Sequence, residues 1–286
     1  MRRFAAALAA AGSLAISAPA VAQYAPPNTS VVSIWPQDAP NLPRRNDPEI
    51  AKDYWVRNVH NPSLTIFRPK RQNGAAIIVI PGGAHKLIVW TTEGLNVGPA
   101  LNRYGVTVFV LKYRLAKEEG ATATIDDSAA DVRRSIRWVR AHAAEYGVDP
   151  HRVGIMGFSA GGELVSLVAD NQPAKVTAAL DGIDRQSDRP DFQVLVFPGP
   201  MGVPANDVAH APPAFITAGT LDDCCAKPAV QLYEQLRSAG RDAELHMYAG
   251  AGHAFNLDES NRISVIHWPD RLADWLADEG LLDARR

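Results

Sequence analysis

The sequence predicts a doubly wound α/β domain, in which helices cover both faces of a mostly parallel sheet. Short apolar runs typical of buried strands alternate with helical patterns along most of the chain. The chain has 286 residues, of which 47% are hydrophobic and 21% are charged, a composition typical of globular proteins with a large core. Its net charge of −2 gives no electrostatic footprint for nucleic acid or an anionic membrane, so we expect neither as a partner.

The elements follow one another in alternation. The expected strands are the apolar runs at 63–69, 75–80, 106–112, 153–156, 193–197, 214–218 and 243–248. The expected helices lie at 93–104, 126–143, 160–169, 229–239 and 269–277. The second helix is clearly marked, because Asp126 and Asp127 suit a helix start and apolar residues then recur at helical spacing until Gly147. Only about sixteen residues, rich in Pro and Gly, separate the strands at 193–197 and 214–218, so we expect an open cleft without a large lid.

The N-terminus has the pattern of a secretory signal. Arg2 and Arg3 precede an apolar run at 4–16, and Ala20-Val21-Ala22 forms an A-x-A cleavage site. The apolar run is shorter than the roughly 20 residues that a membrane span needs. We expect a signal peptide at 1–22, cleaved after Ala22, and a periplasmic or secreted mature protein. A Pro- and Asn-rich lead at 25–48 indicates a loosely packed, linker-like arm within 23–62, before the folded domain at 63–286.

The only two cysteines, Cys224 and Cys225, are adjacent in the sequence. Neighbouring Cα atoms lie about 3.8 Å apart, which is below the usual range for a disulfide. We therefore expect two free thiols, although an oxidising compartment could still pair them with each other or with another chain.

The stretch GFSAGG places Ser159 at the junction of the strand at 153–156 and the helix at 160–169. Ligands of open α/β sheets bind outside the carboxyl ends of the strands, so this serine is well placed for chemistry. A sharp strand-to-helix turn holds its nucleophile in a strained conformation and needs small neighbours, which Gly157, Gly161 and Gly162 supply. The alternatives are a glycine-rich phosphate cradle or a plain turn. The surrounding strand and helix favour a nucleophile.

A serine nucleophile needs a base, and the base needs an acid to fix its tautomer. Asp222 follows the strand at 214–218 and His253 follows the strand at 243–248, in the chain order Ser, acid, His that this architecture requires. Asp223 is a rival acid, but Asp222 stands closer to the strand end. No H-E-x-x-H pattern or Cys/His spacing indicates a metal, and the chemistry requires no cofactor.

An oxyanion hole is expected from backbone amides. Ala160 supplies the amide that follows the nucleophile, and Gly83 and Ala84 supply amides from the turn after the strand at 75–80. His85 and Trp90 lie near this turn and are candidate contacts for the alcohol or sugar part of a substrate, with core packing an equal alternative for Trp90. Tyr113 and Arg114, which follow a buried strand, are interpreted as structural.

A set of motifs in the stretch 63–255 also resembles a known family: IPGGAHKLI, EG at 93–94, VLKYRL, VGIMGFSAGGEL, APPAFITAGTLDD and GAGHAF. In this order they resemble the secreted α/β-hydrolase esterases of the acetyl-xylan-esterase-like group, which remove acyl groups from polysaccharides. The resemblance implies the α/β-hydrolase fold, a triad of Ser159, Asp222 and His253, and an acylated carbohydrate as substrate. The chain departs from this group where Ala84 and His85 replace a third glycine and an aromatic residue, and where the two cysteines replace a valine and a proline.

Other functions are weighed against a serine esterase. A serine peptidase of the prolyl-oligopeptidase type uses an equivalent triad but needs a large gating domain, for which we expect no room. A dienelactone-type or lactone hydrolase typically has a cysteine nucleophile, whereas Ser159 occupies the turn here. A non-catalytic polysaccharide-binding protein is disfavoured because all three triad candidates are present and the aromatic content of 7% indicates no stacking platform.

Overall fold

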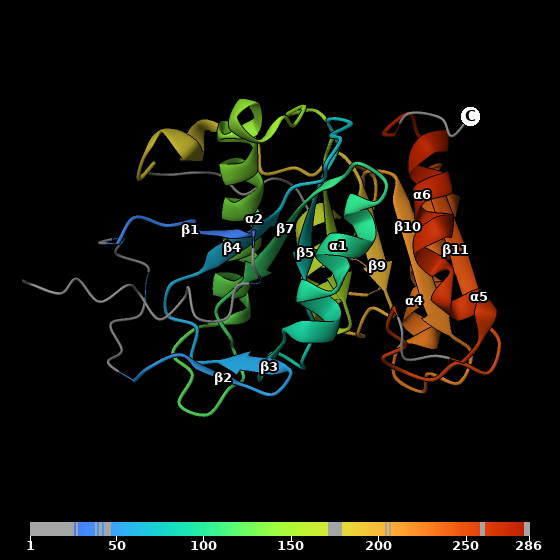
Figure 1. The fold of residues 1–286 in the computed structure, drawn as a ribbon. Helices are drawn as coiled ribbons and strands as arrows, with labels where there is room; N and C mark the ends of the chain where they lie inside the picture. Colours follow the sequence, from blue (N-terminus) through green and yellow to red (C-terminus); the bar gives the residue numbers. More distant parts are fainter. Residues whose placement is uncertain are drawn as a thin grey trace, which may run out of the picture.

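The computed structural model describes residues 26–282 apart from 27, 38, 40–41, 43–46, 171–178, 204, 206 and 258–260. An eight-stranded sheet runs through the middle of the molecule and helices pack against it (Figure 1). The strand order is β1-β4-β7-β5-β8-β9-β10-β11. The strands of this sheet are β1 (Ser30–Ser33), β4 (Ser63–Phe67), β5 (Ala76–Ile80), β7 (Thr107–Lys112), β8 (Val153–Phe158), β9 (Gln193–Val196), β10 (Ala214–Gly219) and β11 (Ala243–Tyr248).

The sheet is parallel from β7 to β11 and antiparallel at one end. β5 pairs in parallel with β7 and β8, β9 lies parallel between β8 and β10, and β10 pairs in parallel with β11. β4 runs antiparallel to both β7 and β1. The strands β5, β7, β8, β9 and β10 are buried along their whole length, which explains their continuous apolar sequences. Their carboxyl ends meet at one edge, where the loops that carry the candidate residues begin.

The α-helices are α1 (Val97–Asn102), α2 (Ile125–Ala141), α3 (Ala160–Ala169), α4 (Ala226–Ser238), α5 (Ile263–Ile266) and α6 (Trp268–Asp278). α2 and α3 contact each other and the strands β5 and β8, whereas α1 and α6 lie together on the other face and border a shared cavity (Figure 1). α4 packs on β10 and β11. Short 3-10 segments, η3 (Ala143–Tyr146) and η4 (Gly182–Arg185), complete this part of the fold.

The structure confirms the predicted fold class and most strand positions to within about two residues. The expected helix at 93–104 differs, because it is divided into a π-helical turn, η2 (Thr91–Leu95), and α1. In η2 the amide of Leu95 donates to the carbonyl of Trp90 at 2.8 Å, and the amide of Asn96 donates to that of Thr91 at 2.9 Å. These bonds span five residues, so the segment is wider than an α-helix.

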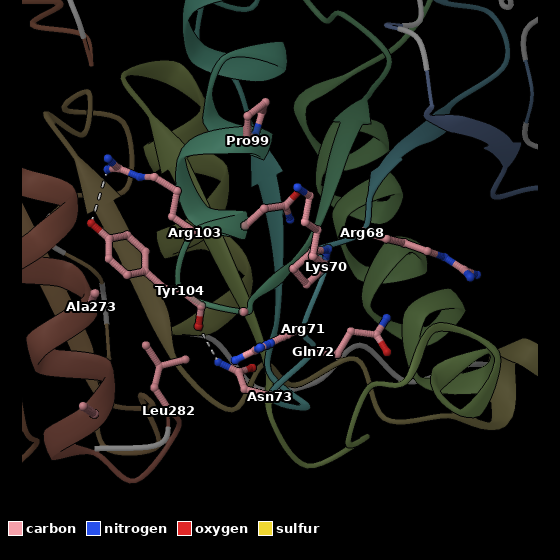
Figure 2. A pocket seen from close by; sticks show the side chains of 14 residues that line it. Arg68, Lys70, Arg71, Gln72, Asn73, Pro99, Arg103, Tyr104, Ala273 and Leu282 are labelled. Atoms are coloured by element: carbon pink, nitrogen blue, oxygen red, sulfur yellow. Dashed lines mark hydrogen bonds between the residues drawn. The ribbon is translucent and has the colours of Figure 1, made fainter. Parts of the chain in front are cut away.

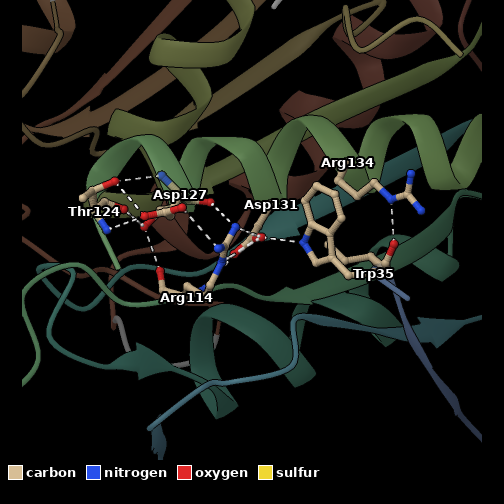
Figure 3. A network of polar contacts seen from close by, with 8 residues as sticks. Trp35, Arg114, Thr124, Asp127, Asp131 and Arg134 are labelled. Atoms are coloured by element: carbon tan, nitrogen blue, oxygen red, sulfur yellow. Dashed lines mark hydrogen bonds and ion pairs between the residues drawn. The ribbon is translucent and has the colours of Figure 1, made fainter. Parts of the chain in front are cut away.

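Part of the lead at 25–48 packs against the domain, in contrast to the loosely packed arm expected there. β1 is an edge strand of the main sheet, and β2 (Ile50–Lys52), β3 (Trp55–Arg57) and β6 (Ile88–Val89) form a second sheet. Ile34 is buried, and the indole of Trp35 donates to Asp131 of α2 at 2.7 Å (Figure 3). The folded unit therefore begins before residue 63. The expected signal peptide lies outside the described residues, and none of the described helices combines the length and apolar character needed to cross a bilayer.

Arg114 anchors α2 to the sheet from the end of β7 (Figure 3). Its guanidinium donates to both carboxylate oxygens of Asp131 at 2.7–3.2 Å, and both side chains are almost fully buried. Thr124 and Asp127 form a capping box at the start of α2, and Asp127 also accepts from Arg114 at 3.2 Å. The structural interpretation of Arg114 is confirmed.

Candidate active site

Ser159 lies in the sharp turn between β8 and α3, in a backbone conformation that side chains rarely adopt. Its φ and ψ angles are 48° and −115°. A Cβ atom at Gly161 would overlap the carbonyl oxygen of Ile80, so only glycine lets the start of α3 approach β5 this closely. The close packing fixes the position of the serine hydroxyl at the carboxyl edge of the sheet.

The structure brings Ser159, His253 and Asp222 together in one line of hydrogen bonds. His253 follows β11, and its Nε2 lies 3.0 Å from the Ser159 hydroxyl oxygen. Its Nδ1 lies 2.8 Å from a carboxylate oxygen of Asp222, which follows β10. The loops that carry the acid and the histidine are joined by a bond from the Gly250 amide to the Thr220 hydroxyl, at 2.8 Å. Residues that are 94 positions apart in the sequence therefore meet at the expected edge.

The acid that faces His253 is Asp222, and its rival Asp223 is exposed. The Asp222 side chain is fully buried. Its second oxygen accepts from the amides of Cys224 and Cys225 at 3.2 and 3.0 Å. These two amides and the imidazole fix the orientation of the carboxylate, which in turn fixes the orientation of the ring.

The His253 ring is supported by an aromatic residue that sequence reasoning missed. The buried ring of Phe197 packs edge-on against the imidazole, with the centroids 5.0 Å apart. Phe197 follows β9 directly. In the sequence it is the last residue of the apolar run 193–197, and nothing there distinguishes it from a core residue. The other side of His253 remains open, since 38% of its side chain is exposed. The hydroxyl and imidazole are thus accessible to a molecule from solvent.

The turn that follows β5 packs against the serine turn. Gly83, Ala84 and His85 all have positive φ angles, of 124°, 56° and 59°. A Cβ atom at Gly82 would lie 3.0 Å from the Cβ of Ser159, so the two turns are in contact. Within the described part of the chain, no carbonyl or side chain accepts from the amides of Gly83, Ala84 and Ala160. These amides are therefore available to an external acceptor.

Two buried side chains, Glu93 and Tyr113, hold this turn. The carboxylate of Glu93 in η2 accepts from the Gly82 amide at 2.7 Å. The Tyr113 hydroxyl, at the end of β7, donates to the Pro81 carbonyl at 2.8 Å. Complete burial raises the pKa of Tyr113, so its hydroxyl stays protonated and keeps donating. This finding also gives Tyr113 the structural position expected for it.

His85 and Trp90 do not face the cleft, in contrast to their expected contact with the alcohol or sugar part of a substrate. His85 is 1% exposed, and its Nε2 lies 2.7 Å from the carboxylate of Glu163 in α3. The other oxygen of Glu163 accepts from the Met201 amide at 3.0 Å. Trp90 is buried in the core with the amine of Lys112 5.4 Å from its ring. Both side chains therefore belong to the interior of the protein, which for Trp90 was the alternative interpretation.

The prediction of two free thiols is wrong, because Cys224 and Cys225 form a disulfide. The usual Cα separation describes cysteines on different segments, whereas adjacent cysteines in a turn close a small ring of their own. This turn follows β10 and ends at Cys225, the residue that precedes α4. Donor atoms of Asp222, Cys224, Cys225 and His253 all lie within 4.8 Å of one another, and this is the set of described residues that could hold a metal ion.

A cavity of about 820 Å³ lies away from these residues (Figure 2). It is bordered by the β4–β5 connection, α1 and α6, near the amino ends of β5 and β7. Its basic lining residues, Arg68, Lys70, Arg71 and Arg103, are exposed. Because this cavity lies at the opposite edge of the sheet from Ser159, it has no part in the candidate active site.

Comparisons with known proteins agree with this geometry. Residues 64–198 match the BD-FAE family model, and residues 203–280 match the model of the prolyl oligopeptidase family. The first segment contains the serine turn and the second contains Asp222 and His253. The chain is 27% identical over 226 residues to an acetylxylan esterase of Xylanibacter ruminicola, an alignment that covers 68% of this chain and 44% of that protein. The chain thus spans less than half the length of this curated relative.

Solved structures include close matches to the whole fold. An acetyl ester-xyloside bifunctional hydrolase from Caldicellulosiruptor lactoaceticus superposes with a TM-score of 0.73 at 25% identity, over 88% of this chain and 97% of that one. A propionate-bound thermophilic esterase from Thermogutta terrifontis superposes with a TM-score of 0.71 at 21% identity, over 91% of this chain and 97% of that one. The topology and these matches show that the chain has the α/β-hydrolase fold and resembles esterases over most of its described length.

Proposed function

We propose that the protein is a serine carboxylic-ester hydrolase that works through an acyl-enzyme. The observation that carries this proposal is the continuous line of hydrogen bonds from Ser159 through His253 to the buried Asp222. Together with unpaired backbone amides beside the hydroxyl, this arrangement supplies a nucleophile, a base, an orienting acid and an anion site.

The first half of the reaction forms the acyl-enzyme. As the Ser159 oxygen attacks the ester carbonyl carbon, its proton passes to Nε2 of His253, and the carbonyl oxygen becomes an oxyanion. Asp222 accepts from Nδ1 and stabilises the imidazolium that forms. His253 then gives the proton to the leaving alcohol as the bond between the carbonyl carbon and the alcohol oxygen breaks. In the second half, His253 takes a proton from water as the water oxygen attacks the acyl carbon. The bond between this carbon and the Ser159 oxygen then breaks, His253 returns the proton to Ser159, and the acid is released.

The amides of Gly83, Ala84 and Ala160 would hold the oxyanion. Ala160 is the first residue of α3, so its amide lies at the positive end of the helix dipole. Backbone amides in a rigid turn need little reorganisation when the charge develops. The bonds that Glu93 and Tyr113 make to this turn support its rigidity.

We propose acetylated xylan or a related acylated saccharide as the substrate. This proposal is supported by the acetylxylan esterase and the acetyl ester-xyloside hydrolase among the proteins that the chain resembles. The exposed His253 supports a cleft open enough for a polymer. A panel of acetylated xylo-oligosaccharides and p-nitrophenyl esters of increasing acyl length tests this substrate class. Faster hydrolysis of long acyl chains than of any acetylated saccharide would contradict it.

The proposed activity is tested with p-nitrophenyl acetate and a fluorophosphonate probe. We expect hydrolysis and covalent labelling by the wild type, and loss of both in Ser159→Ala. Ser238→Ala is the matched control, because this serine is exposed at the end of α4. A wild type that neither releases p-nitrophenol nor reacts with the probe would end the esterase proposal.

A serine peptidase is the second candidate, because residues 203–280 match the prolyl oligopeptidase family. The described residues form an eight-stranded and a three-stranded sheet with their helices, and among them no separate gating domain that would select peptides is present. Cleavage of a Gly-Pro amide substrate at a rate comparable with ester hydrolysis would favour the peptidase. Retention on insoluble xylan without any hydrolysis would instead favour a binding protein.

We also propose export, with cleavage after Ala22. The N-terminal pattern supports it, and so does the Cys224–Cys225 disulfide, because disulfides persist in oxidising compartments. Intact mass and N-terminal sequencing of the protein from a secreting host test this proposal. A protein that remains intracellular and keeps its first 22 residues would contradict it.

A further inference from the structure

The turn that carries the candidate acid also gathers two sulfurs beside a histidine. Donor atoms of Asp222, Cys224, Cys225 and His253 lie within 4.8 Å of one another. In the oxidised protein the two sulfurs are bonded to each other. A thiolate is the sulfur species that binds metal ions well, so the disulfide withholds two of the four possible ligands.

Reduction would supply ligands of the right type at nearly the right spacing. A tetrahedral zinc ion binds cysteine sulfur at about 2.3 Å and histidine nitrogen at about 2.0 Å, which places ligand atoms roughly 3.3–3.8 Å apart. The donor atoms already lie within 4.8 Å of one another, so side-chain rotations that separate the two sulfurs after reduction can bring them onto one ion with His253. Thiolate and imidazole together select zinc and other thiophilic ions over magnesium or calcium.

The surroundings leave part of this cluster open to solvent and part of it buried. Cys224 is exposed, as is much of the His253 side chain, so an ion from solvent can reach them. Cys225 is buried and directly precedes α4, a helix of 13 residues. Asp222 adds a buried carboxylate to the same cluster.

We propose that reduction of the Cys224–Cys225 disulfide creates a binding site for a thiophilic divalent ion of the zinc class, with Cys224, Cys225 and His253 as ligands. A dithiol reductant supplies the two electrons and two protons that convert the disulfide into two thiols, and is itself oxidised to a disulfide. The metal ion then displaces both thiol protons. The metal site does not depend on the proposed esterase activity.

Metal binding would stop catalysis, a consequence that does rest on the proposed function. An ion on Nε2 of His253 blocks the nitrogen that faces Ser159. An ion on Nδ1 leaves the proton on Nε2, so that this nitrogen cannot accept the serine proton. In either case the base is lost. The reduced protein would therefore be inhibited by zinc-class ions, whereas the disulfide protects the oxidised protein from them.

The experiment titrates the full chain with Cd²⁺, whose bonds to thiolate absorb in the ultraviolet. The protein is reduced with a phosphine, desalted without oxygen and compared with oxidised wild type and with reduced Cys224→Ser. We expect one Cd²⁺ per reduced wild-type chain, a thiolate absorption band, and an affinity at least about 100-fold above that of the oxidised protein. His253→Ala should keep the band but weaken binding about tenfold, which a site made of the two thiols alone would not show.

The same samples are assayed with p-nitrophenyl acetate. Stoichiometric Cd²⁺ should abolish hydrolysis only in the reduced wild type, and a chelator should restore it. The absorption titration stands even for a chain without esterase activity, so failure of the proposed function would not be mistaken for failure of the metal site. Circular dichroism checks that each variant is folded. A reduced, folded wild type without the absorption band, or equal Cd²⁺ affinity of the oxidised protein, would overturn the proposal.

Discussion

Asp170 has a buried carboxyl group, and its ionisation should lower the free energy of unfolding. It follows α3 directly and is 4% exposed. Its oxygens accept from the Gln193 amide at 2.7 Å and from the Ser166 hydroxyl at 2.8 Å, but no positive side chain in the described structure pairs with it. Burial raises the pKa of Asp170 from 3.8 to about 6, because the two neutral hydrogen bonds offset only part of the desolvation cost.

The sign of the effect follows from proton binding. Between about pH 4 and pH 6 the folded protein holds a proton on this carboxyl that the unfolded chain has released, so stability falls as the pH rises through this window. Below about pH 4, Asp170 does not change the free energy of unfolding. Above about pH 6, it lowers the free energy of unfolding by a constant amount. A difference of about 2 pKa units corresponds to about 3 kcal/mol in the free energy of unfolding.

Asp170→Asn removes the charge and keeps the shape of the side chain. The new amide can accept from Gln193 and donate to Ser166, whose hydroxyl also bonds the Gly202 carbonyl at 2.9 Å. We expect Asp170→Asn to be more stable than the wild type by up to about 3 kcal/mol at pH 8, and the gain to vanish near pH 4.

Urea unfolding of both proteins at several pH values measures this difference, and other titrating groups cancel between them. Asp278→Asn is the matched control, because Asp278 also lies at the end of a helix but is exposed. We expect no comparable gain from it. A stability difference between Asp170→Asn and wild type that stays constant from pH 4 to pH 8 would refute the argument from burial.

Three further predictions concern the site and its support. Asp222→Asn should lower kcat for p-nitrophenyl acetate by about 10³–10⁴-fold with little change in KM, whereas Asp223→Asn, on the exposed side of the same loop, should keep the wild-type rate. Glu93→Ala leaves the Gly82 amide, in the turn that follows β5, without its carboxylate acceptor. It should lower kcat about tenfold or more while the fluorophosphonate probe still labels Ser159. Arg114→Met leaves Asp131 as an unpaired buried charge and should lower the free energy of unfolding by about 3–5 kcal/mol in a urea titration.

The positions of the strands along the chain and the meeting of the triad residues could be predicted because both follow from local patterns. Buried strands such as β5 and β8 have continuous apolar sequences, and parallel strands bring the residues after their carboxyl ends to one edge. Ser159 directly follows β8, and Asp222 and His253 lie in the loops that begin at the ends of β10 and β11. Their convergence therefore needed only the strand positions and the rule of parallel pairing.

The errors arose where long-range contacts decide the structure. The polar lead contains β1, which joins the sheet only because β4 offers it an unpaired edge. His85 follows a glycine turn at the site but points inward, because the buried Glu163 of α3 provides its partner. Neither contact has a signature in the local sequence. The cysteine pairing was missed for a different reason, since the expected Cα separation applies to distant cysteines and not to neighbours.

The strained backbone at the site shows why these long-range contacts matter for chemistry. Ser159, Ala84 and His85 all adopt positive φ angles, and such residues cost about 1–3 kcal/mol each unless their surroundings hold them. Two carboxylates hold the turn that follows β5. Glu93 of η2 bonds the Gly82 amide, and Glu163 of α3 bonds the His85 ring. Glycine-rich motifs in the sequence mark the turns whose backbone is strained. The contacts that hold these turns come from distant segments and are visible only in the folded structure. Substitutions at the two glutamates are therefore expected to lower kcat although neither side chain touches the reacting atoms.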